Sequence, residues 1–269
     1  MTYDAIIIGA GPAGVTCAVY LKRAGLNVLV LYKDSGSLKF ATIDNFYSYE
    51  SIKGEDLFNK GLEQLKANNI DVVMTEVLAI SQELDFRLMT TSGDYLGKYL
   101  VIASGLNKGV IPKKYQEYLG NGVSTCAFCD GPFYRKKSVW VTGKEPYLTQ
   151  MKTELSYFTK DINVIDESLI NSLFGTERIE GVELNNGETL SINNLFIAIP
   201  LGASSISTNL GVMIDDKNNI KVDENMRTNL KKVYAIGDCI KGKRQVSKAV
   251  YDGMTAGYAI IEDFKSLNK

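Results

Sequence analysis

The chain has 269 residues, of which 45% are hydrophobic and 23% charged, ordinary values that exclude a disordered, collagen-like or coiled-coil protein. Its 30 lysines and arginines nearly balance 31 aspartates and glutamates, which argues against a nucleic-acid binder that relies on bulk positive charge. The absence of histidine excludes a Ser-His-Asp triad, a Cys-His pair and any histidine-ligated metal, so acid–base work falls to carboxylates, Lys, Tyr or Cys.

Strand and helix patterns alternate over the first hundred residues. A strand at 4–8, a glycine-rich turn, a helix at 15–24 and a strand at 27–32 predict a βαβ unit with parallel strands. The other elements expected here are a helix at 54–68 and strands at 71–75, 77–82, 86–91 and 97–103, the middle ones forming an antiparallel meander. The Ser104-Gly105 turn and Pro112 mark a domain exit.

A second, shorter alternation of strands and helices begins near Ser138. Its expected elements are a strand at 138–142, a helix at 147–159 and a strand at 161–165. Asn185-Asn186-Gly187 predicts a hairpin that joins strands at 180–184 and 189–192. The remaining elements are expected at 195–200, 220–222 and 233–236, all strands, and at 245–263, a final helix.

No targeting or membrane segment is expected. The apolar residues 5–8 have no basic region before them and run into glycines, unlike a signal peptide. No run of 18 apolar residues could span a bilayer. Four cysteines are too few for a disulfide-stapled secreted scaffold. These patterns predict a cytoplasmic protein with neither membrane nor nucleic-acid partners.

The glycine-rich turn after the first strand matches G-x-G-x-x-G. Its first glycine permits a tight turn, its second lets the backbone approach a pyrophosphate, and its third lets helix and strand pack closely. The helix that follows points its N-terminus at the anionic ligand. The predicted dinucleotide contacts are Gly9, Gly11, Pro12, Ala13 and Gly14. Tyr32 stands where an acidic ribose contact is expected, and Asp34 is the alternative.

Cys126 and Cys129 form a C-x-x-C pair that has three readings: half a zinc site, a redox dithiol or a chance spacing. Zinc needs four ligands, and Cys17 and Cys239 are single and widely separated, so no metal is expected. A redox pair fits better, because this spacing permits a reversible disulfide and a lowered thiol pKa. Asp130 follows directly and is either a proton donor to a thiolate or a turn residue. Cys17 and Cys239 are interpreted as packing cysteines.

A third motif lies near the C-terminus. Gly237-Asp238 follows a predicted strand, and Arg244-Gln245 opens the last helix. In a flavoprotein an aspartate at this place can hydrogen-bond the ribityl chain, and the helix N-terminus can face the C2 carbonyl of the flavin ring.

Together these motifs resemble those of the low-molecular-weight thioredoxin reductase family. The matching segments run in family order over nearly the whole chain and are Gly9–Gly14, Ile43–Phe46, Ala103–Gly105, Val123–Tyr134, Ala235–Asp238 and Arg244-Gln245. The resemblance implies an α/β fold of two Rossmann-like, three-layer ββα domains and a homodimer. The FAD domain is expected to be discontinuous, at 1–111 and 230–269. The inserted domain at 112–229 is a shortened, degenerate NADPH-binding-like domain that carries the C-x-x-C pair.

The resemblance also implies the cofactor, the partner and the roles of individual residues. The implied FAD contacts are Gly9, Gly11, Pro12, Ala13, Gly14, Tyr32, Asn45, Ala103, Gly105, Gly237, Asp238, Arg244 and Gln245. FAD is expected to reduce the Cys126–Cys129 disulfide, with Cys129 as the sulfur nearer the flavin. Cys126 then attacks the disulfide of thioredoxin, and Asp130 moves the proton.

The second domain departs from the family's NADPH site. Where a second G-x-G-x-x-G/A should follow a strand, Trp140–Tyr147 holds one glycine, and Pro146 and Tyr147 replace small residues. The arginine pair that would hold a 2′-phosphate is missing from the acidic segment Asn163–Glu167, and several dozen residues usual in this domain are absent. This pattern resembles the ferredoxin-dependent flavin thioredoxin reductases, which keep FAD and the dithiol and take electrons from reduced ferredoxin.

The predicted activity is therefore that of a ferredoxin-dependent thioredoxin-disulfide reductase. Two alternatives remain, an NAD(P)H-dependent thioredoxin reductase and an oxygen-dependent dithiol oxidase, while the intact dithiol argues against a flavin- or partner-binding module without catalysis. Because ferredoxins are typically acidic, a basic docking surface is expected. The candidate residues for it are Lys113, Lys114, Arg135, Lys136, Lys137, Lys241, Lys243 and Arg244.

Overall fold

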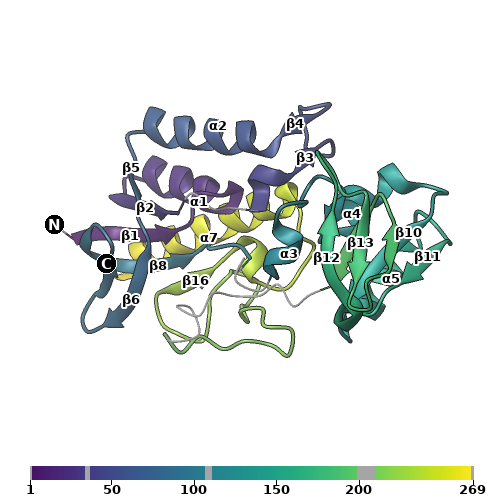
Figure 1. Cartoon of the computed structure of the whole chain (residues 1–269). Coiled ribbons are helices and arrows are strands. Elements are labelled where there is room, and N and C mark those ends of the chain that lie inside the picture. Colours follow the sequence, from purple (N-terminus) through teal and green to yellow (C-terminus); the bar gives the residue numbers. More distant parts are fainter. Residues whose placement is uncertain (1, 34–36, 107–110, 199–209, 268–269) are drawn as a thin grey trace. The chain divides into compact units, whose positions relative to one another are not determined.

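The computed structural model describes residues 2–33, 37–106, 111–198 and 210–267 (Figure 1). The chain divides into two compact units, one formed by residues 1–107 and 201–269 and the other by residues 108–200. Each unit contains its own parallel sheet with helices packed on it, so the expected α/β fold class is confirmed.

The first unit is built on a sheet with the strand order β5-β2-β1-β8, and β16 pairs with the other edge of β8. The bounds of these parallel strands are β1 Thr2–Ile8, β2 Val28–Tyr32, β5 Asp71–Met74, β8 Gly93–Ile102 and β16 Val233–Ala235. The first half of β8 also pairs antiparallel with β7 (Phe86–Thr90), which in turn pairs with β6 (Val77–Gln82). The predicted meander is therefore present, and it continues the main sheet.

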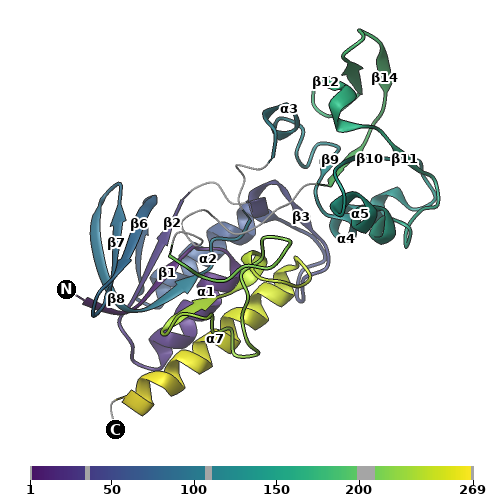
Figure 2. The ribbon, with the colours of Figure 1, turned by 90° about the horizontal axis from the view of Figure 1, so that it is seen from below.

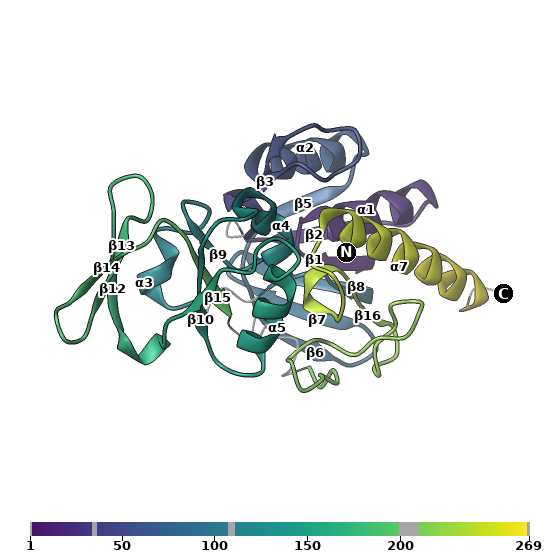
Figure 3. The same ribbon diagram turned by 90° about the vertical axis from the view of Figure 1, so that its right-hand side faces the viewer.

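Among its described residues this unit has the helices α1 (Pro12–Arg23), α2 (Gly54–Ala67) and α7 (Val246–Leu267), and α1 and α7 run side by side (Figure 3). Their close approach depends on glycine. A Cβ atom at Gly253 would lie 2.3 Å from the carbonyl oxygen of Ala13, and one at Gly257 would lie 2.9 Å from the Cβ of Tyr20. The backbone of α7 thus rests directly on α1, next to the glycine-rich turn. A short ribbon of β3 (Thr42–Ile43) and β4 (Ile52–Lys53) precedes α2.

The second unit has a parallel sheet in the order β11-β10-β15-β9 and a separate antiparallel sheet of three strands (Figure 2). The strands of the parallel sheet are β9 Val123–Ser124, β10 Val139–Gly143, β11 Ile162–Val164 and β15 Leu195–Ala198. The antiparallel strands are β12 Ile170–Phe174, β13 Gly181–Leu184 and β14 Thr189–Ser191. The helices are α3 Lys113–Gln116, α4 Ala127–Asp130 and α5 Tyr147–Leu155, and a core between α4, α5 and the parallel sheet buries Ala127, Met151 and Phe196.

Several expected bounds differ from those in the structure. The strand expected at 220–222 does not form, because Ile220 makes only isolated bridges to Ile214 and Ile240. The helix expected to reach 159 ends at Leu155, since the Thr159 hydroxyl donates to the Lys137 carbonyl at 2.6 Å and turns the chain toward β11. β12 was not expected.

The end of the insert also differs, at 200 in the structure against the expected 229. Residues 210–232 pack within the first unit, where the Ile220 N–H donates to the Cys239 carbonyl at 2.8 Å. Arg227 donates to Asp263 on α7 at 2.8 Å. None of the helices in the described parts of the chain combines the length and hydrophobicity that a bilayer crossing requires.

Candidate active site

The glycine-rich turn joins β1 to α1, and its three glycines meet different surroundings. Gly9 has φ +119°, and a Cβ atom there would lie 2.1 Å from the carbonyl oxygen of Ala103. A Cβ atom at Gly14 would lie 2.0 Å from the carbonyl oxygen of Gly9. Around Gly11, by contrast, no described atom outside Ala10–Pro12 comes within 4 Å of the Cβ position. The fold itself therefore requires Gly9 and Gly14, whereas Gly11 opens onto free space.

The N-terminus of α1 begins at this open space and suits an anion. Gly11 is the N-cap residue and Pro12 begins the helix. The first turn of α1 contains no acidic side chain, and the N-cap glycine has no side chain that could bond to its amides. The helix dipole places positive potential here, and the first amides lack intrahelical partners. Lys22 and Arg23 lie in the last turn, at the opposite pole. The turn therefore fits the pyrophosphate of a dinucleotide such as FAD.

Other expected FAD contacts converge on the same edge of the sheet. The Ala103 carbonyl faces Gly9, and a Cβ atom at Gly237, which has φ +77°, would lie 3.0 Å from the Cβ of Ala13. The Nδ2 of Asn45 donates to the Oε1 of Gln245 at 2.9 Å, although 200 residues separate them in the chain. The structure thus joins segments that the sequence analysis could only select one by one.

Four expected contacts have individual surroundings. Tyr32 ends β2, and its ring packs against Phe58 of α2 with the centroids 5.9 Å apart. Gly105 has φ +64° and free space at its Cβ position among the described residues. Burial raises the pKa of Asp238, which the positive charge of Arg244 partly offsets. Asp34, the alternative ribose contact, lies outside the described residues.

An ion pair that the sequence did not reveal lies under the Gly237 turn. Lys248 Nζ lies 2.6 Å from the Oδ2 of Asp252, and the exposed fractions of the two side chains are 20% and 2%. Asp252 Oδ2 accepts the N–H of Gly237 at 3.0 Å, and Lys248 Nζ donates to the Gly237 carbonyl at 3.0 Å. The i, i+4 spacing of a lysine and an aspartate in a predicted helix was the available signal.

Cys126 immediately precedes α4 and is held by its neighbours on both sides. Its N–H donates to the Oγ of Ser124 at 3.0 Å, and its carbonyl accepts the N–H of Asp130 at 3.2 Å. Ala127, the next residue, is fully buried in the core of the unit. Cys126 is disulfide-bonded, as a redox cysteine in its oxidised state would be, while the side chain of Cys129 lies outside the described residues.

The other two cysteines are buried in the first unit with free thiols. Burial raises the pKa of both Cys17 and Cys239 to about 12, so neither forms a thiolate at neutral pH. Their interpretation as packing residues is confirmed. Among the described residues no group of three or more acidic or cysteine side chains could hold a metal ion.

The second strand–turn–helix shares one backbone feature with the first, a glycine of positive φ where the strand ends. Gly143 ends β10 with φ +136°, and a Cβ atom there would lie 2.0 Å from the carbonyl oxygen of Ala198, as Gly9 does against Ala103. Counted from this glycine, Glu145 stands in the place of Gly11. Its carboxylate accepts the N–H of Thr149 at 3.2 Å and the Thr149 hydroxyl at 2.9 Å. The first turn of α5 is therefore capped by an acidic side chain of the chain itself.

The acidic end of the next strand is also engaged. Asp166 accepts the N–H of Ser168 at 2.9 Å and its hydroxyl at 2.8 Å. These hydrogen bonds lower the pKa of Asp166, so the carboxylate is negative at neutral pH. The part of this unit that would hold a pyridine nucleotide thus presents two carboxylates.

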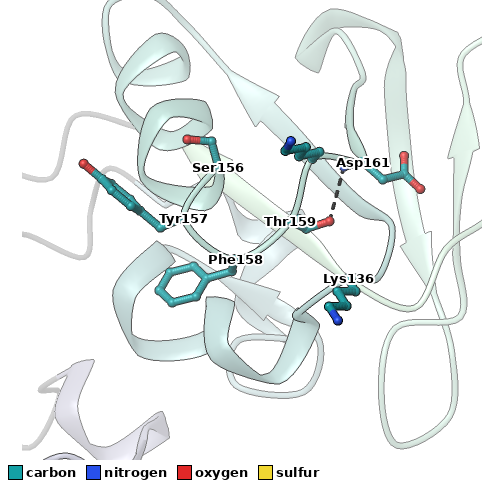
Figure 4. A pocket seen from close by; sticks show the side chains of 7 residues that line it. Lys136, Ser156, Tyr157, Phe158, Thr159 and Asp161 are labelled. Carbon is teal, nitrogen blue, oxygen red and sulfur yellow. Dashed lines mark hydrogen bonds between the residues drawn. The ribbon is translucent and has the colours of Figure 1, made fainter.

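A surface hollow of about 430 Å³ lies beside the end of α5 and is lined by Lys136 and residues 156–161 (Figure 4). The dashed line in Figure 4 is the hydrogen bond from the Asp161 N–H to the Thr159 hydroxyl, at 3.2 Å. The Arg135 guanidinium lies 5.7 Å from the ring centroid of Phe158. Lys136 and Lys137, two docking candidates, are exposed here. Lys114, another candidate, is half-buried and donates to the Ile170 carbonyl at 2.6 Å, so its charge serves the fold.

Comparisons with known proteins agree with this architecture. The model of the pyridine nucleotide-disulphide oxidoreductase family matches residues 3–144 and 149–253. The break between the two stretches falls at residues 145–148, in the turn that Glu145 occupies. Among solved structures, the chain is similar to thioredoxin reductase from Streptococcus pyogenes, with 26% identity, a TM-score of 0.86 and coverage of 98% of this chain and 99% of that one.

Curated relatives lead to the same family. Thioredoxin reductase from Ureaplasma parvum is 30% identical over 291 residues, which cover 94% of each protein, and that from Listeria monocytogenes is 29% identical over 293 residues, with 95% and 92% covered. Both alignments are longer than this chain, so the relatives contain residues that it lacks. The chain therefore belongs to the low-molecular-weight thioredoxin reductase family of pyridine nucleotide-disulphide oxidoreductases, as a flavin-dependent disulfide oxidoreductase with FAD as its cofactor.

Proposed function

We propose that this chain is a thioredoxin-disulfide reductase that takes electrons from reduced ferredoxin, rather than from NADPH, and passes them to thioredoxin through the Cys126–Cys129 pair. The names of its relatives support thioredoxin as the acceptor. The observation that carries the choice of donor is Glu145, whose carboxylate bonds to the first turn of α5.

A nicotinamide dinucleotide needs this helix terminus for its pyrophosphate. Glu145 uses the Thr149 amide and brings a negative charge to the place where two phosphate charges would have to bind. The anionic Asp166 would repel the additional phosphate of NADPH.

Bound FAD would supply chemistry that thiols lack, since it takes up electrons singly and delivers them as a pair to a disulfide. The remaining steps belong to the chain. The Cys126 thiolate attacks one sulfur of the thioredoxin disulfide and forms a mixed disulfide, and Cys129 then attacks the Cys126 sulfur, which re-forms the intramolecular bond and releases thioredoxin. The two sulfurs of thioredoxin leave as thiols, and Asp130 moves the proton. The short α4 turn holds Asp130 against Cys126, because the Asp130 N–H bonds to the Cys126 carbonyl.

We further propose the family's homodimer and a cytoplasmic location for the working enzyme. The exposed cations Arg135, Lys136 and Lys137 directly follow the dithiol segment and are the candidates within the second unit for docking an acidic protein. Lys241 and Lys243 are exposed candidates in the first unit. A discontinuous FAD domain, with FAD contacts contributed by both ends of the chain, is part of this proposal.

The test is anaerobic reduction of the purified yellow protein with NADPH, NADH and reduced ferredoxin in separate cuvettes, followed by the visible flavin bands. The proposal expects bleaching with ferredoxin alone and recovery of colour after addition of oxidised thioredoxin. Rapid bleaching with NADPH would show that the Gly143 turn still binds nucleotide and would refute the choice of donor. Bleaching by a small dithiol with oxygen consumption, and no response to ferredoxin, would identify the dithiol oxidase instead.

A further inference from the structure

The ion pair between Lys248 and Asp252 holds both backbone polar groups of Gly237. Asp252 accepts the glycine N–H and Lys248 donates to the glycine carbonyl, each at 3.0 Å, while the two side chains lie 2.6 Å from each other. The three groups form a closed triangle. Since Asp252 is only 2% exposed, water cannot replace the missing partner if either side chain is removed.

We propose that Lys248 and Asp252 are positioning residues for the flavin: they fix the Gly237 turn so that Asp238 meets the ribityl side of FAD. This inference rests on FAD binding at the Gly237-Asp238 motif. The peptide that links Gly237 to Asp238 begins at the carbonyl that Lys248 binds, so Lys248 sets the direction in which the next residue leaves the turn.

The turn is confined, and its conformation is one that glycine adopts readily and other residues rarely do. Gly237 has φ +77° and lies against Ala13, which belongs to the first turn of α1. Movement of Gly237 would therefore displace the ribityl contact relative to the pyrophosphate turn. The stem of Lys248 reaches the site past Gly242, where a Cβ atom would lie 2.8 Å from the Cε of the lysine. Two glycines thus accommodate one lysine and its hydrogen bonds.

The charges in this part of the unit are balanced around Lys248. Asp238 and Asp252 are neighbouring carboxylates, and burial raises the pKa of each. The Lys248 ammonium opposes the increase at both, and Arg244 does so at Asp238. Lys248 therefore opposes the protonation of two carboxylates, the one that holds the turn and the one proposed to bind the cofactor.

A positioning role and a merely structural role predict different ligand selectivity. ADP shares the adenine, ribose and pyrophosphate of FAD but has no ribityl chain or flavin ring. The Gly9–Gly14 turn serves both ligands, whereas Gly237-Asp238 serves FAD alone. Loss of the pair should therefore weaken the binding of FAD and leave that of ADP unchanged.

The experiment compares the variants Lys248→Met, Asp252→Asn and the double variant in the full chain freed of FAD. The double variant leaves no unpaired buried charge, so it folds even if a single variant does not. FAD affinity is measured by quenching of flavin fluorescence, and ADP affinity by calorimetry. Loss of a charge-assisted hydrogen bond predicts that the FAD dissociation constant rises at least about tenfold in each variant, with ADP affinity unchanged within about twofold.

Arg227→Met is the matched control, because Arg227 pairs with Asp263 on the same helix, at 2.8 Å, away from the Gly237 turn. This variant should leave both affinities unchanged. Equal weakening of FAD and ADP in the double variant would assign the pair to general stability and overturn the proposal. Unchanged FAD affinity in the folded double variant would overturn it as well.

Discussion

Replacement of Gly11 by alanine separates what the fold requires from what the ligand requires. Gly11 has φ −73° and ψ 177°, a conformation open to alanine, and no described atom outside Ala10–Pro12 lies within 4 Å of its Cβ position. Alanine restricts the unfolded chain, which stabilises by about 0.4–1 kcal/mol, but it is a poorer N-cap than glycine, which costs about as much. The free energy of unfolding of the FAD-free protein should therefore change by less than about 1 kcal/mol.

The methyl group of the Gly11→Ala variant would occupy the space through which the pyrophosphate reaches the α1 amides. Loss of one charge-assisted hydrogen bond costs about 1.5–3 kcal/mol, so the FAD dissociation constant should rise at least about tenfold. Gly9→Ala is the contrasting variant, because its Cβ would lie 2.1 Å from the Ala103 carbonyl oxygen at φ +119°. Backbone strain alone should make the FAD-free Gly9→Ala variant less stable by about 1–3 kcal/mol, and the clash with the carbonyl oxygen adds to this loss.

Thermal unfolding of the FAD-free variants and FAD titration test this pair of predictions. A melting temperature of the Gly11→Ala variant within about 4 °C of wild type, together with weaker FAD binding, is expected. Wild-type FAD affinity in this variant would mean that the open space beside Gly11 is not the path of the pyrophosphate. A Gly9→Ala variant as stable as wild type would refute the use of the carbonyl contact as a measure of strain.

Further predictions concern electron transfer and charge. Cys129→Ser should keep its FAD but lose turnover with thioredoxin, and retained turnover would contradict the role proposed for Cys129. If docking is electrostatic, kcat/KM with ferredoxin should fall steeply between 0.05 and about 0.5 M salt, and Lys136→Glu should weaken that dependence, whereas a flat salt profile would argue against a basic docking surface. Burial by itself would raise the pKa of Asp263, but hydrogen bonds from Arg227 and Tyr234 hold that pKa below its usual range. The ionised carboxylate thus stabilises the fold above the unfolded pKa of about 3.9, and this contribution disappears as the pH falls through the lower folded pKa. Arg227→Met should therefore lower the free energy of unfolding by about 1 kcal/mol at pH 7, with a smaller loss near pH 3 in urea titrations.

Local patterns were sufficient to predict the elements of the first unit, because its strands are continuous apolar runs and its turns use glycine for geometric reasons. The Gly9–Gly14 turn, α1 and the meander have the expected type within a few residues. The strand expected at 220–222 does not form because no neighbouring strand pairs with it. Ile220 alone makes backbone bridges, to Ile214 and Ile240. The paired strand β12 was missed because the adjacent polar residues Asn171 and Ser172 interrupt its apolar pattern.

The site was predictable where one residue type alone can satisfy the geometry, and unpredictable where two distant residues act together. Gly9 and Gly14 are of the first kind, because any side chain would strike a carbonyl oxygen. The contact between Asn45 and Gln245 is of the second kind. The two residues are 200 positions apart in the sequence, and only folding brings their side chains to a hydrogen-bond distance of 2.9 Å. Lys248 and Asp252 resemble an ordinary surface pair in sequence, and only the 2% exposure of Asp252 shows that they are internal.

The two strand–turn–helix units of this chain separate the glycine that the fold requires from the glycine that it does not require. Gly9 and Gly143 share a positive φ and would both place a Cβ about 2 Å from the carbonyl of a parallel neighbour, so the crossing of strand and turn needs glycine in each unit. The Cβ position of Gly11 faces open space, whereas the carboxylate of its counterpart Glu145 accepts the N–H of Thr149 in the first turn of α5. If the second unit binds no phosphate, as we propose, it could lose the second glycine but not the first. The helix terminus still needs an anion, and a carboxylate of the chain supplies it.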